Sequence, residues 1–153
     1  MAIEKVIEYF EVLGCAHKIK QFTVSSATVE LAAEALGCEG ARIAKTLSFL
    51  VDDAPVLVVT AGDMKIDNRK FKDVFHTKAK MLTYEQVDEL IGHSVGGVCP
   101  FAVKEGCRIY LDVSLRRFDI VYPAAGSSNS AIELTPDELE KYSGGQWTDV
   151  CKA

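Results

Sequence analysis

Residues that mark metal centres, disulfide frameworks and membrane spans are scarce in this chain of 153 residues. The three histidines are isolated, and the five cysteines form no C-x-x-C pair, so neither a zinc site nor a redox dithiol is indicated. The longest apolar run, Val56 to Val59, is far shorter than the roughly 20 residues that span a bilayer. We therefore expect reduced thiols, no metal, no cofactor and no membrane partner.

The patterns of nucleotide-binding and triad enzymes also receive little support. No G-x-G-x-x-G or G-x-x-x-x-G-K-[ST] phosphate loop occurs, which disfavours dinucleotide and P-loop enzymes. None of the histidines has a sequence context that identifies it as the partner of a nucleophile, so a conventional triad hydrolase is disfavoured. The first turns are acidic and lack the basic start of a secretory signal, and we expect a cytoplasmic protein.

Positive charge is in deficit, because the formal net charge is −5 at pH 7. Wrapping a long nucleic acid needs many lysine and arginine contacts to phosphate, so DNA is not expected as a partner and any RNA contact must be local. One stretch is basic, from Lys65 to Lys72, with Lys78 and Lys80 beyond it. This stretch is either a local RNA contact or the solvated face of a helix.

Periodicity predicts a single globular domain over residues 1–153 that mixes helices and strands. Helices are expected at 3–13, from Ser25 or Ser26 to Leu36, at 67–75, at 83–92 and from Thr135 onward. Strands are expected at 18–22, 43–51, 56–60, 108–113, 118–122 and 131–134. Strands and long helices do not alternate regularly, so the fold class is α+β.

The segment from Ile43 to Val51 alternates strictly and places a lysine, Lys45, on an otherwise apolar face. After a turn at 52–55, the second strand reads as buried on both faces, and the two strands form a hairpin. Burying an unpaired ammonium is costly, so Lys45 either marks an anion site or extends to the sheet edge and pairs with Glu39 or another carboxylate.

Two loops rich in small residues are candidate substrate loops. The segment from Gly92 to Phe101 carries three glycines and Pro100, which allow close backbone approach and exposed amides. The segment from Tyr122 to Ser130 can admit a ligand and donate hydroxyl or amide hydrogen bonds, or it is a plain hairpin connection. Asp112, at a strand end, can cap the next turn or bind a ribose hydroxyl. Cys99 is the one thiol whose place in a glycine loop hints at activity, although free cysteine is commonly a core residue.

These segments together resemble a known family. Ile43-Ala44-Lys45-Thr46-Leu47, then the segment from Gly92 to Phe101, and then Ala125-Gly126 before Ile132-Glu133-Leu134 look like the successive signatures of the YbaK-type aminoacyl-tRNA deacylases. The family includes the editing domain inserted in bacterial prolyl-tRNA synthetases. The similarity runs from the first helix to about Leu139.

The resemblance implies a mixed, curved β-sheet flanked by helices, with a pocket for the aminoacylated 3′ end of a tRNA. It implies removal of a mischarged small amino acid, chiefly alanine or cysteine on proline tRNA, with prolyl-tRNA synthetase as a further partner. The family's strand lysine matches Lys45, and its G-x-x-x-P loop matches Gly96 to Pro100. This sequence departs from many relatives at Ala102, where they have glycine, and at Ser127 and Ser128, where others have lysine and arginine.

On this basis we assign residues to a metal-free ester hydrolysis. Catalysis is assigned to Lys45, Gly96 and Gly97, and substrate binding to Thr46, His93, Val98, Cys99, Pro100, Asp112, Gly126, Ser127 and Ser128. The lysine is expected to hold a phosphate or hydroxyl of the terminal nucleotide, while the two glycine amides orient the carbonyl for attack by water. A cysteine substrate can instead attack with its own thiol. A noncatalytic module that partners a synthetase, and a hydrolase that uses Cys99, are the alternatives.

Overall fold

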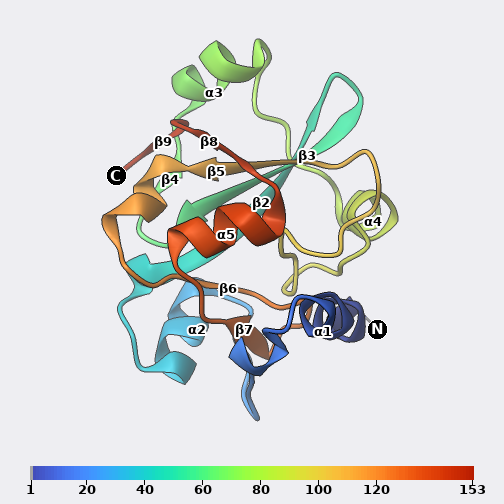
Figure 1. Cartoon of the computed structure of the whole chain (residues 1–153). Helices are drawn as coiled ribbons and strands as arrows, with labels where there is room; N and C mark the ends of the chain where they lie inside the picture. The colour runs from blue at the N-terminus through green and yellow to red at the C-terminus, as the bar shows by residue number, and fades with distance from the viewer. Residues whose placement is uncertain (1) are drawn as a thin grey trace.

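A five-stranded mixed sheet organises the fold, and the computed structural model describes residues 2–153 (Figure 1). Its strand order is β6 (Tyr122–Pro123), β2 (Ile43–Val51), β3 (Ala54–Ala61), β5 (Arg108–Asp112) and β8 (Gln146–Thr148). β2 and β3 are antiparallel, whereas the pairs β2 with β6, β3 with β5 and β5 with β8 are parallel. The fold class predicted from the sequence, α+β with a mixed, curved sheet, is therefore confirmed.

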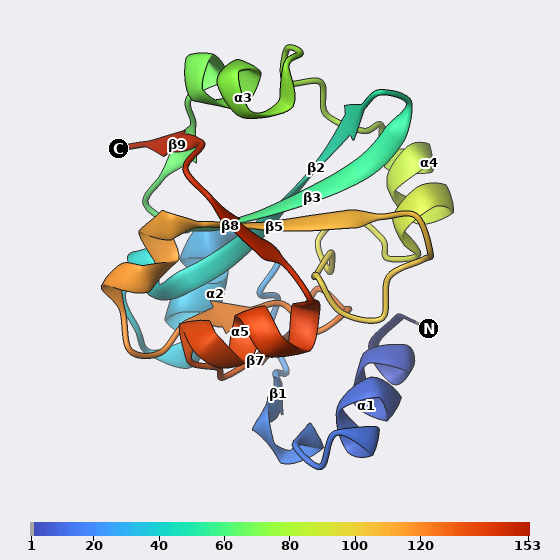
Figure 2. The ribbon, with the colours of Figure 1, turned by 45° about the horizontal axis from the view of Figure 1, so that its top comes forward.

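The β2–β3 hairpin is the longest part of the sheet and has the predicted parity. Lys45 lies opposite Thr60, and the turn residues Asp52 and Asp53 both have positive φ, as a two-residue hairpin turn requires. β3 is the central strand, and residues 56 to 61 are buried on both faces. Figure 2 shows this hairpin crossing β5 obliquely, as expected for a twisted sheet.

The two faces of the sheet are covered by different helices. On one face Phe49 and Val58 pack against Phe71 and Phe75 of α3 (Asn68–Phe75). On the other face, the core combines strand residues with α1 (Ala2–Val12) and α5 (Pro136–Ser143), and α2 (Val29–Leu36) lies beside it (Figure 1). Because side chains alternate between the two faces along β2 and β3, each of these strands contributes residues to both cores.

Short elements complete the chain. Two further strand pairs form, β1 (Ile19–Gln21) with β7 (Ser130–Ile132) and β4 (Lys65–Ile66) with β9 (Cys151–Lys152). The short helical turns are η1 (Ala16–Lys18), η2 (Gly40–Arg42), α4 (Tyr84–Gln86), the π-turn η3 (Val87–Ile91) and η4 (Val113–Arg117). In the described part of the chain, no helix is long and apolar enough to cross a membrane.

Two local predictions were wrong. The cap of α2 is Thr28, whose side chain accepts from the Leu31 N–H, because Ser25 and Ser26 are held by the 128–130 segment instead. The stretch 118–122 is not a strand: only its last residue joins β6, and Asp119 is drawn into an ion pair with Arg42. The helix expected at 83–92 is confirmed, because it begins at the predicted capping box and ends at Gly92, and its second half, η3, is a π-turn.

Candidate functional site

A cavity of about 280 Å³ opens beside the first half of β2. Its floor is the strand from Ile43 to Ser48, and its walls come from the start of α2, the 81–87 segment, the 95–98 loop and the 122–131 region. These segments are far apart in the sequence and meet here because β6 and β7 return beside β2 and the start of α2. The cavity therefore joins the predicted strand site to both predicted loops.

Small aliphatic side chains make up most of the cavity wall. Val29 and Ala32 contribute from α2, Ala44 from β2, Val98 from the glycine loop and Ala131 from β7. No carboxylate or imidazole lines the cavity among residues 2–153. An environment of this kind favours a small apolar group over a charged one.

Lys45 lines the cavity, and among the described residues that line it Lys45 is the only one with a positively charged side chain. Its Nζ donates to the main-chain oxygen of Met64 in the β3–β4 turn. Within residues 2–153 it forms no ion pair, and the predicted alternative partner, Glu39, instead contacts Arg42 at 3.7 Å. The ammonium is therefore oriented by a neutral carbonyl and not by a carboxylate.

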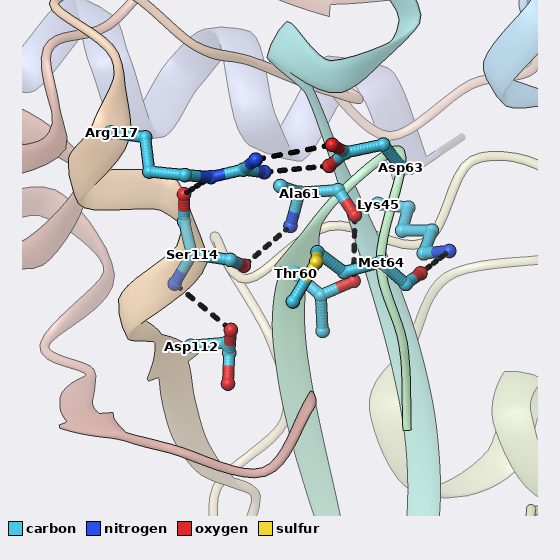
Figure 3. A network of polar contacts seen from close by, with 8 residues as sticks. All are labelled: Lys45, Thr60, Ala61, Asp63, Met64, Asp112, Ser114 and Arg117. Atoms are coloured by element: carbon cyan, nitrogen blue, oxygen red, sulfur yellow. Dashed lines mark hydrogen bonds and ion pairs between the residues drawn. The ribbon is translucent and has the colours of Figure 1, made fainter. Parts of the chain in front are cut away.

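A network behind Lys45 fixes the turn that orients it (Figure 3). The guanidinium of Arg117 binds both carboxylate oxygens of Asp63, at 2.6 and 3.1 Å, and its Nε donates to the Ser114 carbonyl at 2.8 Å. The hydrogen bond from Arg117 lowers the pKa of the Asp63 carboxyl, so this carboxylate stays charged and paired with arginine. Met64 N–H donates to the Ala61 oxygen at 3.1 Å, which closes the turn.

Thr46, next to Lys45, also lines the cavity and presents an unusual hydroxyl. Its Oγ1 is buried and has no hydrogen-bond partner in the described part of the chain. A buried hydroxyl without a partner costs free energy unless a ligand supplies one. Thr46 is thus placed to bind a polar group of a molecule in the cavity.

The two glycines assigned to catalysis differ in what they do. Gly96 lines the cavity at a φ of +97°, and its N–H donates to no group within residues 2–153. The Gly97 N–H instead donates to the Ser94 oxygen at 3.0 Å. A Cβ atom at position 97 would lie 2.7 Å from the Cα and N of Ser127, so this glycine is needed for contact between the loops. Only the Gly96 amide is available to a substrate.

The 126–130 loop lies beside the cavity and braces one of its walls. Gly126, Ser127 and Ser128 do not line the cavity, whereas Ser130 does. The Ser128 carbonyl accepts from the Ser26 N–H at 2.6 Å, and the hydroxyls of Ser127 and Ser130 are 2.6 Å apart. The loop therefore holds the segment that leads into α2.

His93, Cys99 and Pro100 are buried under the glycine loop and do not line the cavity. His93 Nε2 lies 2.8 Å from the Phe101 oxygen, and burial lowers the pKa of its imidazole. Burial raises the pKa of the Cys99 thiol to about 12, so it is protonated at neutral pH and is not a nucleophile. These residues are buried in the core and anchor the loop beside the cavity.

Asp112 caps the turn that follows it, which is one of the two roles that the sequence allowed; the other was binding of a ribose hydroxyl. Its Oδ2 accepts from the Ser114 N–H and its Oδ1 from the Val150 N–H, both at 2.9 Å. The side chain is buried and does not line the cavity. Asp112 therefore holds two main-chain amides in the core and is not exposed to a ribose in the cavity.

The letters from Gly92 to Gly96 spell G-x-S-x-G, so the expectation that no serine has this motif was wrong as a statement about the letters, and the structure decides whether Ser94 lies in a nucleophile elbow. A nucleophile elbow places its serine between a strand and a helix. Ser94 instead lies in a turn after η3, and it does not line the cavity. In residues 2–153, no group of three or more histidine, cysteine or acidic side chains is placed to hold a metal ion.

Several lining residues had no signal in the sequence. They are Ala27, Val29, Met81 and Tyr84. Each belongs to a cap, a turn or a short bridge whose position depends on contacts with distant segments. The capping box at Thr83 fixed the helix start but gave no indication that its next residue faces a cavity.

Comparisons with known proteins agree with this geometry. A family model described as an aminoacyl-tRNA editing domain matches residues 23–142. The chain is 49% identical to the uncharacterized protein YwhH of Bacillus subtilis, over 99% of this chain and 98% of that protein. It is 29% identical to EbsC of Enterococcus faecalis, named as a candidate Cys-tRNA(Pro)/Cys-tRNA(Cys) deacylase, over 80% of this chain and 76% of that protein. A solved structure described as a candidate trans-editing enzyme for prolyl tRNA synthetase superposes with a TM-score of 0.90 at 29% identity, covering 99% of this chain and 98% of that one.

Proposed function

Because the chain belongs to the aminoacyl-tRNA editing domain family, we propose that it is a trans-editing hydrolase that removes a mischarged small amino acid from a tRNA. The observation that carries the proposal is the ammonium of Lys45, which forms no ion pair within residues 2–153, at a small cavity walled by aliphatic residues. The amino acid is alanine or cysteine, the tRNA is tRNA(Pro), and the activity is located in the cytoplasm.

The aliphatic cavity wall supports the choice of substrate. A synthetase site separates amino acids that differ by one methylene by only ~1–3 kcal/mol, which leaves errors for a second sieve. We propose that the side chain of alanine or cysteine lies among Val29, Ala32 and Ala131 and that contact with this wall, rather than the total volume, rejects the ring of proline. The description of EbsC as a candidate Cys-tRNA(Pro)/Cys-tRNA(Cys) deacylase supports cysteine, and the matching candidate trans-editing enzyme for prolyl tRNA synthetase supports the proline system.

In the mechanism that we propose, Lys45 binds a phosphate or hydroxyl of the terminal nucleotide, and the Gly96 amide stabilises the developing oxyanion. One amide donor of this kind contributes about 10² to 10³ in rate. Water adds to the ester carbon, the bond to the ribose oxygen breaks, and that oxygen leaves with a proton. With a cysteine substrate, the thiol of the substrate can take the place of water.

Thr46 and the bracing loop complete the proposed site. The Thr46 hydroxyl gains its missing partner when a polar group of the aminoacyl ester enters the cavity. Gly97, Gly126, Ser127 and Ser128 act by holding the loops together. Val98 contributes to the apolar wall.

A noncatalytic module that binds the aminoacyl end beside prolyl-tRNA synthetase is the second candidate. The observation in its favour is that the described cavity lining contains no carboxylate or imidazole that can act as a general base. Such a module would bind charged tRNA without releasing the amino acid.

The test is release of amino acid from tRNA(Pro) charged separately with alanine, cysteine, serine or proline. We expect the protein to release alanine or cysteine and to spare proline, with equal rates in the presence of a metal chelator. The Lys45→Ala variant should be inactive, while Lys20→Ala, at an exposed lysine on β1, should match the unmodified protein. Binding of charged tRNA without release of any amino acid would instead support the noncatalytic module.

A further inference from the structure

The rim of the cavity carries exposed apolar side chains. Met81, Tyr84 and Val95 are 57%, 77% and 48% exposed, and all three line the cavity. In the described part of the chain they are three of the nine large hydrophobic residues that are exposed. Apolar side chains gathered at one opening mark an interaction site rather than scattered surface positions.

Met81 and Tyr84 are exposed on a backbone that is firmly held. The Leu50 N–H donates to the Lys80 oxygen at 2.8 Å, and the Leu82 N–H donates to the Ser48 oxygen at 3.2 Å, so this segment lies along β2. The capping box of Thr83 fixes the start of α4, and the Val87 N–H donates to the oxygen of the next residue, Tyr84, whose hydroxyl has no hydrogen-bond partner within residues 2–153. The ring is therefore presented to solvent by a rigid support.

The chain that leads to this rim is the most basic part of the molecule. Residues 65–80 hold six lysine and arginine residues and two aspartates, a net charge of +4. The whole chain has a net charge of −5, so the remainder has a net charge of −9. Lys78 and Lys80 are exposed and lie immediately before Met81. Two exposed cations therefore precede the exposed Met81 and Tyr84 along the chain, and surfaces that bind single-stranded nucleic acid combine these two kinds of side chain.

We propose that the terminal base of the tRNA 3′ end stacks on Tyr84 and Met81, with Lys78 and Lys80 contacting the phosphates that precede it. This inference rests on the proposed function, because it identifies how the same cavity receives its substrate. Stacking of a base on a tyrosine ring does not depend on matching hydrogen bonds. In this arrangement Tyr84 and Met81, which we call the platform, hold the 3′ end of the tRNA while the cavity selects the amino acid. It also explains how an acidic protein can hold RNA through a local contact.

The test uses an RNA hairpin that mimics the acceptor stem, with fluorescent 2-aminopurine as its unpaired terminal base. Stacking quenches this base, so titration with the protein reports both affinity and contact. We expect quenching by the unmodified protein and by Tyr84→Phe. Tyr84→Ala should lose the quenching and bind roughly 5- to 150-fold more weakly. Val12→Ala, at the most exposed hydrophobic residue, serves as the control.

The lysines are tested by the salt dependence of the same titration. Each phosphate contact on a single strand contributes about 0.7 to the slope of log affinity against log salt. The Lys78→Ala, Lys80→Ala double variant should therefore lower the slope by about 1.4, and it should keep the quenching when bound. An unchanged slope would overturn the phosphate contacts.

The outcomes separate this proposal from the proposed function. Deacylation by the unmodified protein together with equal quenching by Tyr84→Ala overturns the platform and leaves the function standing. Quenching that depends on Tyr84 without any deacylation supports the platform and overturns the hydrolase. A protein that neither quenches the base nor binds the hairpin overturns the platform outright, and the rim is then a surface for a protein partner.

Discussion

Replacing Gly97 with alanine tests whether contact between the two loops shapes the site. The added Cβ would lie 2.7 Å from the Cα and N of Ser127 and 2.9 Å from the carbonyl carbon of Gly126. All three are backbone atoms, so no side chain can rotate away to relieve the contact. The glycine loop must move away from the 126–130 loop by several tenths of an ångström.

The size of the effect follows from this displacement. Overpacking that shifts backbone costs about 1–3 kcal/mol. With a urea dependence of about 2 kcal/mol per molar, the unfolding midpoint should fall by about 0.5–1.5 M. Gly96 moves with the loop, and a misplacement of about 1 Å near the reacting atoms can cost about 100-fold in rate.

The assay is urea unfolding followed by fluorescence, together with deacylation under native conditions. Gly40→Ala is the matched control, since its Cβ would meet only the Val29 Cγ1 atom, at an ordinary 3.4 Å. We expect that variant to change the midpoint little and to keep its activity. A Gly97→Ala protein with an unchanged midpoint and full deacylation would refute the reasoning.

Four further predictions follow from contacts at the site. Cys99→Ala should keep deacylation within about twofold, because a thiol with a pKa of about 12 takes no part in it; loss of activity in a folded variant would contradict this. The folded state lowers the pKa of His93, so the unfolded chain binds more protons and stability should fall as the pH drops below about 6.5. Urea midpoints at pH 7.5 and 5.5 should therefore differ more in the unmodified protein than in His93→Gln. Thr46→Val should stabilise the free protein by about 1 kcal/mol while lowering kcat/KM roughly fivefold, a combination that a purely structural hydroxyl would not give. Arg117→Ala should cost less than about 1 kcal/mol of stability at this exposed pair but slow deacylation through Lys45, and equal kcat values would show that the network does not position the lysine.

Much of the architecture could be predicted from local patterns. Strict alternation from Ile43 to Val51 gave the hairpin and the two faces, since side chains on a strand alternate by geometry alone. The capping boxes at Thr83 and Thr135 and the cap at Asp67 gave three helix starts, because each depends on hydrogen bonds within one turn. These signals are local and need no partner from elsewhere in the chain.

Errors arose where a distant segment competes for the same groups. Thr28 rather than Ser25 or Ser26 caps α2, because the 128–130 segment takes the serines. The short strands β8 and β9 carry no periodic pattern, and their pairing with β5 and β4 follows only from the path of the chain after α5. The propensity of a short segment does not show which distant segment will bind its side chains or pair with its backbone.

The sequence by itself determined the α+β class, the hairpin and the place of Lys45 on it, and its motifs indicated the editing family. Tertiary structure alone decided which residues meet at the cavity: Thr46 and Gly96 line it, whereas His93, Cys99 and Asp112 are turned into the core. It also brought Met81 and Tyr84 to the rim. The physical reason is that a loop motif fixes the order of residues, but the side of the backbone that faces the cavity is set by packing against segments far away in the chain.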